Sequence, residues 1–69
     1  MIFMEIYIEK DNVTKTVDVE GSKKLVEILK ELNISLESVI LVKNGEVCLE
    51  EELVSNEDKI KLLSVVSGG

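Results

Sequence analysis

Hydrophobic and polar residues alternate along the first part of the chain, and a period of two is typical of half-buried strands. In the run from Ile2 to Glu9, one predicted face carries Met4, Ile6 and Ile8, and the other carries Phe3, Glu5, Tyr7 and Glu9. Val13 to Val19 alternates again, and the polar residues 10–12 between the two runs indicate a turn. These two segments are therefore predicted to form a β-hairpin.

The next segment changes from strand to helix spacing. Ser22 is expected to cap the helix, because its hydroxyl can accept a hydrogen bond from a free backbone N–H. Asn33 is expected to end the helix, since asparagine tolerates the left-handed conformation found there. The apolar stripe falls at i, i+3, i+4 and i+7 and consists of Leu25, Ile28, Leu29 and Leu32.

The second half of the chain predicts further strands. Val39 to Lys43 reads as a strand, and Asn44-Gly45 after it is a strong hairpin signal, because both turn positions need positive φ. Glu46 to Leu49 would be a short return strand. Glu50 to Lys59 is predicted as a loop with one helical turn over residues 50–53. Ile60 to Val66 is expected to be the last strand.

The predicted order is therefore β-β-α-β-β, in a sheet of four or five strands, followed by a flexible tail of Ser67, Gly68 and Gly69. One helix can cover only one face of such a sheet, so we expect an α+β fold with its second face open. Residues 1–66 would form one domain, and residues 67–69 would form the tail.

Composition narrows the chemistry that this chain can perform. Its 69 residues include 14 acidic and 8 basic residues, all of the latter lysines, and the net charge is −6. A negative chain repels a nucleic-acid backbone, and without arginine it lacks the planar fork that binds phosphate or guanine. The absence of histidine removes the commonest general base and argues against a zinc site. We therefore expect no nucleic-acid partner, no metal and no catalytic residues, so the chain is not predicted to be an enzyme.

Cys48 is the only cysteine, so no disulfide can form within the chain, which favours a reducing cytoplasmic location. No apolar run approaches the roughly 20 residues that a membrane-spanning helix needs, so no membrane association is expected. We interpret Cys48 as a small, buried apolar residue. The alternative is a redox or persulfide thiol.

The element order and the ending VVSGG resemble the ubiquitin-like β-grasp proteins, in particular the ThiS and MoaD sulfur carriers and the related small archaeal modifiers. The resemblance covers the whole chain and is sharpest over Leu62–Gly69. The hairpin VILVKNGEV at Val39–Val47 and the turn Asn56-Glu57-Asp58 agree with it. Many relatives have Gly-Asp at that turn, where this chain has Glu57-Asp58. The resemblance implies a helix packed on a mixed sheet.

The resemblance also implies a function. A partner enzyme related to the ubiquitin-activating enzymes would use ATP to adenylate the carboxyl group of Gly69. A sulfurtransferase would then supply the sulfur of a thiocarboxylate, which a synthase would use to make thiamine, molybdopterin or thiolated tRNA. No cofactor would be bound to the chain itself. Gly68 and Ser67 would tether Gly69, and glycine suits a narrow channel because it has no Cβ.

Two other functions remain open from the sequence. The chain could be a protein modifier that is joined through Gly69 to lysines of target proteins, or a non-covalent binding module that happens to end in glycine. Neither the sulfur-accepting pathway nor the oligomeric state can be chosen from the sequence. The source organism is equally open.

The open face of the sheet predicts a docking surface. If Lys61 and Lys43 face water, their strands place Leu41, Leu63 and Val65 on the outer face, together with Phe3 and Tyr7 from the first strand. In the family's strand order these residues would form one exposed apolar patch leading to the tail, and such patches mark partner sites. The alternatives are a patch covered by the loop of residues 50–59 or paired with its own copy. The acidic side chains of that loop could steer the chain toward a basic partner.

Overall fold

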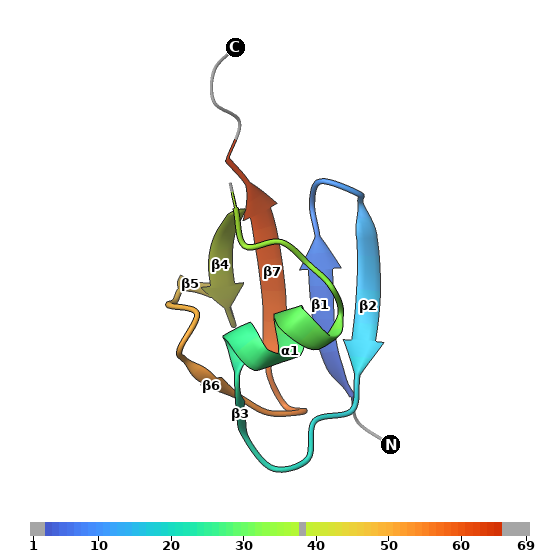
Figure 1. Cartoon of the computed structure of the whole chain (residues 1–69), viewed down its shortest axis with the longest axis vertical. Coiled ribbons are helices and arrows are strands. Elements are labelled where there is room, and N and C mark those ends of the chain that lie inside the picture. Colours follow the sequence, from blue (N-terminus) through green and yellow to red (C-terminus); the bar gives the residue numbers. More distant parts are fainter. Residues whose placement is uncertain (1–2, 38, 66–69) are drawn as a thin grey trace.

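The computed structural model describes residues 3–37 and 39–65, and it shows a mixed sheet with one helix across one face (Figure 1). The five strands of this sheet are β1 (Met4–Ile8), β2 (Val13–Val17), β4 (Val39–Lys43), β5 (Glu46–Val47) and β7 (Lys59–Ser64). They lie in the order β2-β1-β7-β4-β5. Strands β1 and β7 are parallel and the other neighbours are antiparallel. The predicted α+β class, with one helix on a mixed sheet, is confirmed. Two further short strands, at residues 23–24 and 53–54, were not predicted.

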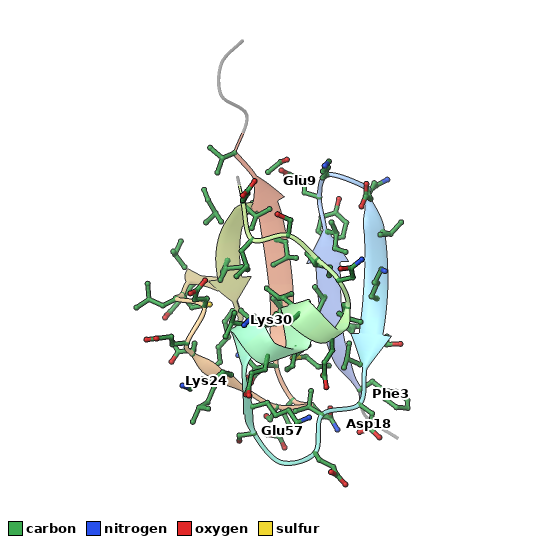
Figure 2. All side chains as sticks on the ribbon, in the orientation of Figure 1. Phe3, Glu9, Asp18, Lys24, Lys30 and Glu57 are labelled. Atoms are coloured by element: carbon green, nitrogen blue, oxygen red, sulfur yellow. The ribbon has the colours of Figure 1, made fainter. Side chains whose placement is uncertain are left out.

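The core lies between helix α1 (Leu25–Glu31) and the sheet face that we call the inner face (Figure 2). The predicted stripe is confirmed, because Leu25, Ile28 and Leu29 are fully buried and Leu32 packs against them. The inner face contributes Met4, Ile6, Ile8, Leu41, Ile60 and Leu62. The alternation predicted for the first strand therefore places its three apolar residues correctly.

The start of the helix differs from the prediction, because Ser22 is not its cap. Residues Lys23 and Lys24 form strand β3 (Lys23–Lys24), which pairs with β6 (Leu53–Val54), so the chain stays extended up to the helix. The N–H groups of Leu25 and Val26 donate to the carbonyls of Glu52 and Glu50, at 2.9 Å each. Backbone carbonyls of a distant loop therefore accept the hydrogen bonds of the first N–H groups of the helix, a role that was expected of the Ser22 hydroxyl.

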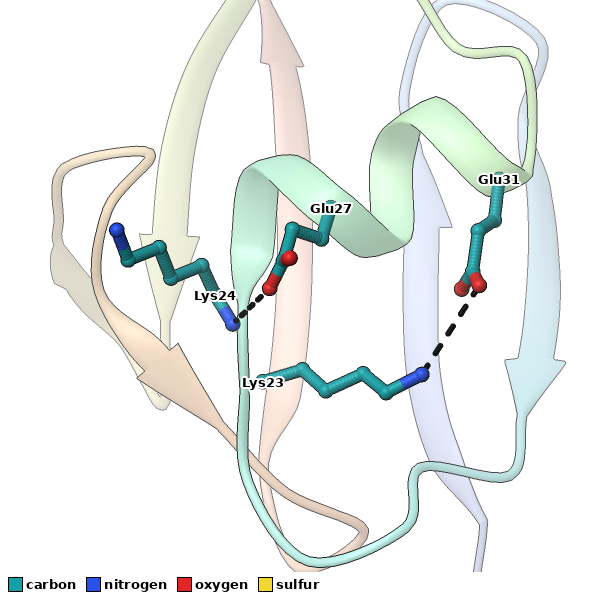
Figure 3. Close-up of polar contacts among 4 residues, drawn as sticks. All are labelled: Lys23, Lys24, Glu27 and Glu31. Atoms are coloured by element: carbon teal, nitrogen blue, oxygen red, sulfur yellow. Dashed lines mark hydrogen bonds and ion pairs between the residues drawn. The ribbon is translucent and has the colours of Figure 1, made fainter.

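Two side-chain contacts accompany this start (Figure 3). The N–H of Lys24, the N-cap residue, donates to Oε2 of Glu27 at 3.3 Å. Lys23 lies outside the helix and reaches Glu31, with 3.9 Å between Nζ and Oε1. Because both partners of this ion pair are exposed, the pair contributes little to stability.

The segment from Glu50 to Lys59 contains no helical turn, contrary to the prediction. A turn closed by the N–H of Glu52 on the carbonyl of Leu49, at 3.0 Å, is followed by β6. Because this segment pairs with β3 and contacts the helix start, it lies on the helix side of the sheet. It therefore does not cover the opposite face, which excludes one alternative for the predicted patch.

The predicted turns are confirmed. Asn44 and Gly45 both have positive φ, 51° and 86°, as a two-residue hairpin of this hand requires. Asn33 follows the helix with a φ of 58°. Strand β2 ends at Val17, two residues earlier than predicted, and as an edge strand it leaves Val13 exposed. Within residues 3–37 and 39–65, the structure has no helix of the length and apolar character needed to cross a membrane.

Candidate functional site

The face of the sheet away from α1 is here called the outer face, and it carries most of the residues that were predicted to form the docking surface. Neighbouring strands place their residues in rows across it. Tyr7 of β1 lies beside Lys61 of β7, which lies beside Val42 of β4. One step further toward the tail, Leu63 of β7 lies beside Ile40 of β4. Side chains that are opposite or diagonal in this way are within contact range.

The assignment of Leu41 to this face is wrong. Leu41 lies opposite Leu62, is only 8% exposed and belongs to the core under the helix. The prediction relied on Lys43 facing water. In the structure Lys43 lies at the strand end, on the inner side, and its Nζ donates to the carbonyl of Leu53 at 3.0 Å. A one-residue shift exchanges the faces of a strand, so Ile40 and Val42 are the outer residues.

Phe3 is exposed, but it lies far from the C-terminal end of β7. It precedes β1, whose start lies beside the start of β7, whereas the tail follows the end of β7. Figure 2 shows Phe3 near the N-terminal end of the sheet and Glu9 near the opposite end. The row of Glu5 and Lys59 separates Phe3 from Tyr7 on the outer face. Phe3 is therefore not part of a patch beside the tail.

The apolar surface at the end of the sheet where β7 finishes is here called the tail-side patch, and it consists of Tyr7, Ile40, Val42, Leu63 and Val65. Ile40 and Val65 are exposed, and Tyr7 and Leu63 are half-buried. Val42 is buried without belonging to the core under the helix, so its neighbours on the outer face cover it. Leu63 and Tyr7 lie on the face predicted for them, Val65 follows β7 and is exposed, and this surface replaces the predicted one.

Glu9 holds the end of β7, a role that the sequence pattern does not reveal. Its N–H donates to the carbonyl of Leu62 at 3.0 Å, and its Oε1 accepts from the N–H of Ser64 at 2.9 Å. The strand is therefore attached to β1 up to Ser64, three positions before the predicted tail begins at Ser67. Ser67, Gly68 and Gly69 lie outside the described residues, so their predicted roles remain predictions.

At the opposite end of the sheet, Asp58 joins two turns. Its carboxylate accepts from Nδ2 of Asn44 at 2.9 Å and from the N–H of Ser55 at 2.8 Å. Asn44 in turn accepts from the N–H of Lys59 at 2.9 Å. Partial burial alone would raise the pKa of Asp58, but these hydrogen bonds and the Lys43 ammonium hold it below its ordinary value. These hydrogen bonds give the cluster a structural role, which is to join the two turns, so no ligand is needed to explain it.

Cys48 is half-buried and packs against the core. Burial raises the pKa of its thiol, the Glu52 carboxylate raises it further, and the Lys43 ammonium opposes them only in part. A raised pKa leaves less of the reactive thiolate at neutral pH. The structure therefore favours the interpretation of Cys48 as a packing residue over that of a sulfur-handling thiol.

A mixed five-stranded sheet in this order, with one helix across its inner face, defines a ubiquitin-like β-grasp protein. The ThiS family model matches residues 1–69. The sulfur carrier protein TtuB of Thermus thermophilus is 40% identical to this chain over 55 residues, which are 80% of this chain and 85% of that protein. The chain belongs to the ThiS family.

Two solved structures agree with this assignment. ThiS, a thiamine biosynthesis protein from Geobacter metallireducens, superposes with a TM-score of 0.66 at 27% identity, over 96% of this chain and 100% of that one. SAMP1 from Haloferax volcanii superposes with a TM-score of 0.76 at 23% identity, over 97% of this chain and 99% of that one. The likeness to SAMP1 concerns the fold alone. The predicted family is confirmed, and the sulfur-carrier function that it implied is supported.

Proposed function

We propose that this chain is a sulfur carrier whose reacting group is the carboxyl group of Gly69. The observation that carries the proposal is the match to the ThiS family over residues 1–69, which includes Gly68 and Gly69. The described geometry is compatible with it. Strand β7 is held to β1 up to Ser64, and the tail-side patch lies on the same end of the sheet.

The chemistry requires a partner, because an ionised carboxylate is a poor electrophile and has a reference pKa of about 3.3–3.7. In the proposed reaction, the Gly69 carboxylate attacks the α-phosphorus of ATP, forming an acyl adenylate and releasing pyrophosphate. The persulfide of a sulfurtransferase then displaces AMP and forms an acyl disulfide, and a second thiol cleaves this bond, which releases the thiocarboxylate while the two thiols are oxidised to a disulfide. An adenylating enzyme would bind the ATP, and a sulfurtransferase would deliver the sulfur.

In this proposal the chain is a substrate of its partners and has no catalytic role. The tail-side patch would bind the adenylating enzyme, because an exposed apolar surface beside the reacting end can position that end in a partner's active site. The sulfur would pass to a synthase for thiamine, molybdopterin or thiolated tRNA, and the name of the Geobacter metallireducens relative favours thiamine. We place the carrier in the cytoplasm, as its single cysteine suggested.

Intact-mass spectrometry of the chain isolated from its own host, with sequencing of the C-terminal peptide, tests the proposal. We expect a mass increase equal to sulfur replacing one oxygen, located at a free carboxyl group of Gly69. A chain lacking Gly69 is the matched control and should never gain this mass. Gly69 joined only to lysines of other proteins would support the modifier function instead. If neither state is found in abundant protein, the binding-module alternative gains support.

A further inference from the structure

Strand β4 has an open edge over its first half. On one side it pairs with β7 along its whole length, but β5 covers only Val42 and Lys43 on the other side. Figure 1 shows no strand beside the remaining part of that edge. The carbonyl of Leu41 accepts from the N–H of Cys48 at 2.9 Å, which shows that the backbone groups of Leu41 point away from β7.

Because backbone groups alternate between the two sides of an antiparallel strand, the N–H and C=O of Val39 point the same way as those of Leu41. Among the described residues, no partner is recorded for these groups of Val39 or for the N–H of Leu41. An unpaired row of this kind is a template for another strand. Proteins commonly block such an edge with charged side chains, but here the edge carries apolar ones.

A groove of about 480 Å³ runs along this open edge. Its apolar lining includes the two most exposed large hydrophobic side chains of the described residues, Val47 at 76% and Leu49 at 75%. The rest of its apolar lining consists of Leu36, Val39, Ile40, Leu41 and Cys48. Open backbone groups and apolar side chains at the same edge are the two features that recognise an extended peptide.

The charge of the groove defines the partner's chemistry. Among the residues that the structure describes, the only charged ones that line it are Glu50 and Glu51, both exposed. The loop that carries them is fixed, because the carbonyls of Glu50 and Glu52 accept from the first N–H groups of α1. A second copy of this chain would bring the same two glutamates to the edge, and like charges facing each other oppose such pairing. A basic segment would be attracted.

We propose that the open edge of β4 binds an extended partner segment in which apolar residues alternate with polar ones and a lysine or arginine lies beside them. The segment would add a strand next to Val39–Leu41, place its apolar side chains against Val47 and Leu49, and pair its basic residue with Glu50 or Glu51. This surface shares only Ile40 with the tail-side patch, and it does not depend on Gly69. A partner can therefore bind it while the predicted tail is engaged elsewhere.

The probe is a short synthetic peptide in which valine alternates with threonine and each end carries a lysine. It is titrated into the ¹⁵N-labelled full chain and followed by NMR. Among the described residues, we expect backbone shifts confined to 36–37, 39–41 and 47–51, and contacts between peptide backbone protons and those of Val39 and Leu41. A peptide with alternate backbone amides methylated should lose binding, because those amides would donate the hydrogen bonds that join the peptide to β4.

Paired variants distinguish binding at this site from non-specific hydrophobic binding. Leu49→Ser should weaken binding about tenfold, since one apolar contact of this size is lost. Leu53→Ser is the matched control, because Leu53 is also an exposed apolar residue, at 56%, but does not line the groove. Likewise, Glu50→Lys combined with Glu51→Lys should abolish the preference for lysine ends, whereas Glu57→Lys should not.

Four outcomes would overturn the proposal. The first is equal binding of a peptide with glutamate ends, and the second is shifts centred on Tyr7 and Leu63 instead of the open edge. The third is the absence of shifts at millimolar peptide. Concentration-dependent shifts at the same edge without peptide would identify a second copy as the occupant, which also contradicts the proposal.

Discussion

The inner and outer faces of the sheet differ in what surrounds their apolar side chains. On the inner face, Ile6, Ile60 and Leu62 are almost fully buried under the helix. On the outer face only Val42 is buried, while Ile40 and Val65 remain exposed. The apolar residues of the inner face are explained by their burial in the core. Burial in the core does not explain the apolar residues of the outer face, which are therefore available for contact with a partner.

The largest effect is expected from the inner face. Leu29→Ala should lower the free energy of unfolding by about 2–5 kcal/mol, because Leu29 is fully buried and a cavity would remain. A chain of this size is stabilised by only about 3–10 kcal/mol in total, so much of the variant should be unfolded. Urea denaturation measures this loss. Leu63→Ala is the matched outer-face variant, and an equal loss in both would remove the distinction between the faces.

The outer face should behave in the opposite way. Leu63→Glu should leave the fold intact but reduce adenylation by the activating enzyme at least about tenfold, because a charge would replace an apolar contact at the centre of the tail-side patch. Circular dichroism checks the fold, and pyrophosphate release measures the rate. Leu53→Glu introduces the same change elsewhere and should adenylate normally. Unchanged adenylation of Leu63→Glu would show that this patch is not the docking surface.

A smaller effect is expected from Glu9, a positioning residue at the tail end of the outer face. Glu9→Ala removes the acceptor for the Ser64 N–H, so β7 should be held less firmly just before the predicted tail. The KM of adenylation should rise about threefold with little change in kcat, since about one hydrogen bond is lost. Glu9→Gln keeps an acceptor oxygen and should restore the KM. A failure of glutamine to do so would mean that the charge matters instead.

Acid should loosen the far end of the sheet without changing either face. The pKa of Asp58 is lowered in the folded chain, so its stabilising contribution is present above the unfolded pKa of about 3.9 and is lost as the pH falls through the folded value. Unfolding measured between neutral pH and pH about 2 should show this loss. Asp58→Asn should be less stable near neutral pH and depend less on pH in that window. An unchanged pH profile would contradict the assigned hydrogen bonds.

The smallest effect is expected from Cys48, which lies between the two faces beside the edge of β4. Cys48→Ser should cost about 1 kcal/mol or less, because the site is only half-buried. Sulfur loading of the variant should stay within about twofold of the original rate, measured by intact mass over time. If loading is lost while the fold is kept, the thiol takes part in sulfur transfer after all.

The comparison of faces also shows which features the sequence can predict. The alternation around Ile6 is unambiguous, and the Asn44-Gly45 turn and the helical stripe are equally local signals. In contrast, β4 contains four consecutive apolar residues at positions 39–42, so its face had to be inferred from Lys43 alone. That inference failed because a long lysine side chain can lie on the inner side at a strand end and still reach a polar partner.

The other differences come from contacts between distant parts of the chain. Strand β3 pairs with β6 about 30 residues later, and only that pairing explains why Ser22 is not the helix cap. The bond between Glu9 and Ser64 spans 55 residues, so no local pattern indicates it. Of the candidate site, Tyr7, Leu63 and Val65 could be placed from alternation, whereas Ile40, Val42 and Glu9 required the register of the sheet.

The central position of β7 has a consequence for the synthesis of the protein. This strand follows every other element described, yet it is the one that joins the β1–β2 hairpin to β4 and β5. While the ribosome is still making the earlier strands, the two halves of the sheet have nothing between them, and long-range pairing of this kind forms late. The outer face is therefore completed only when the strand leading to Gly69 is in place. An activating enzyme that must contact both the outer face and Gly69 would therefore bind only fully folded copies of the chain.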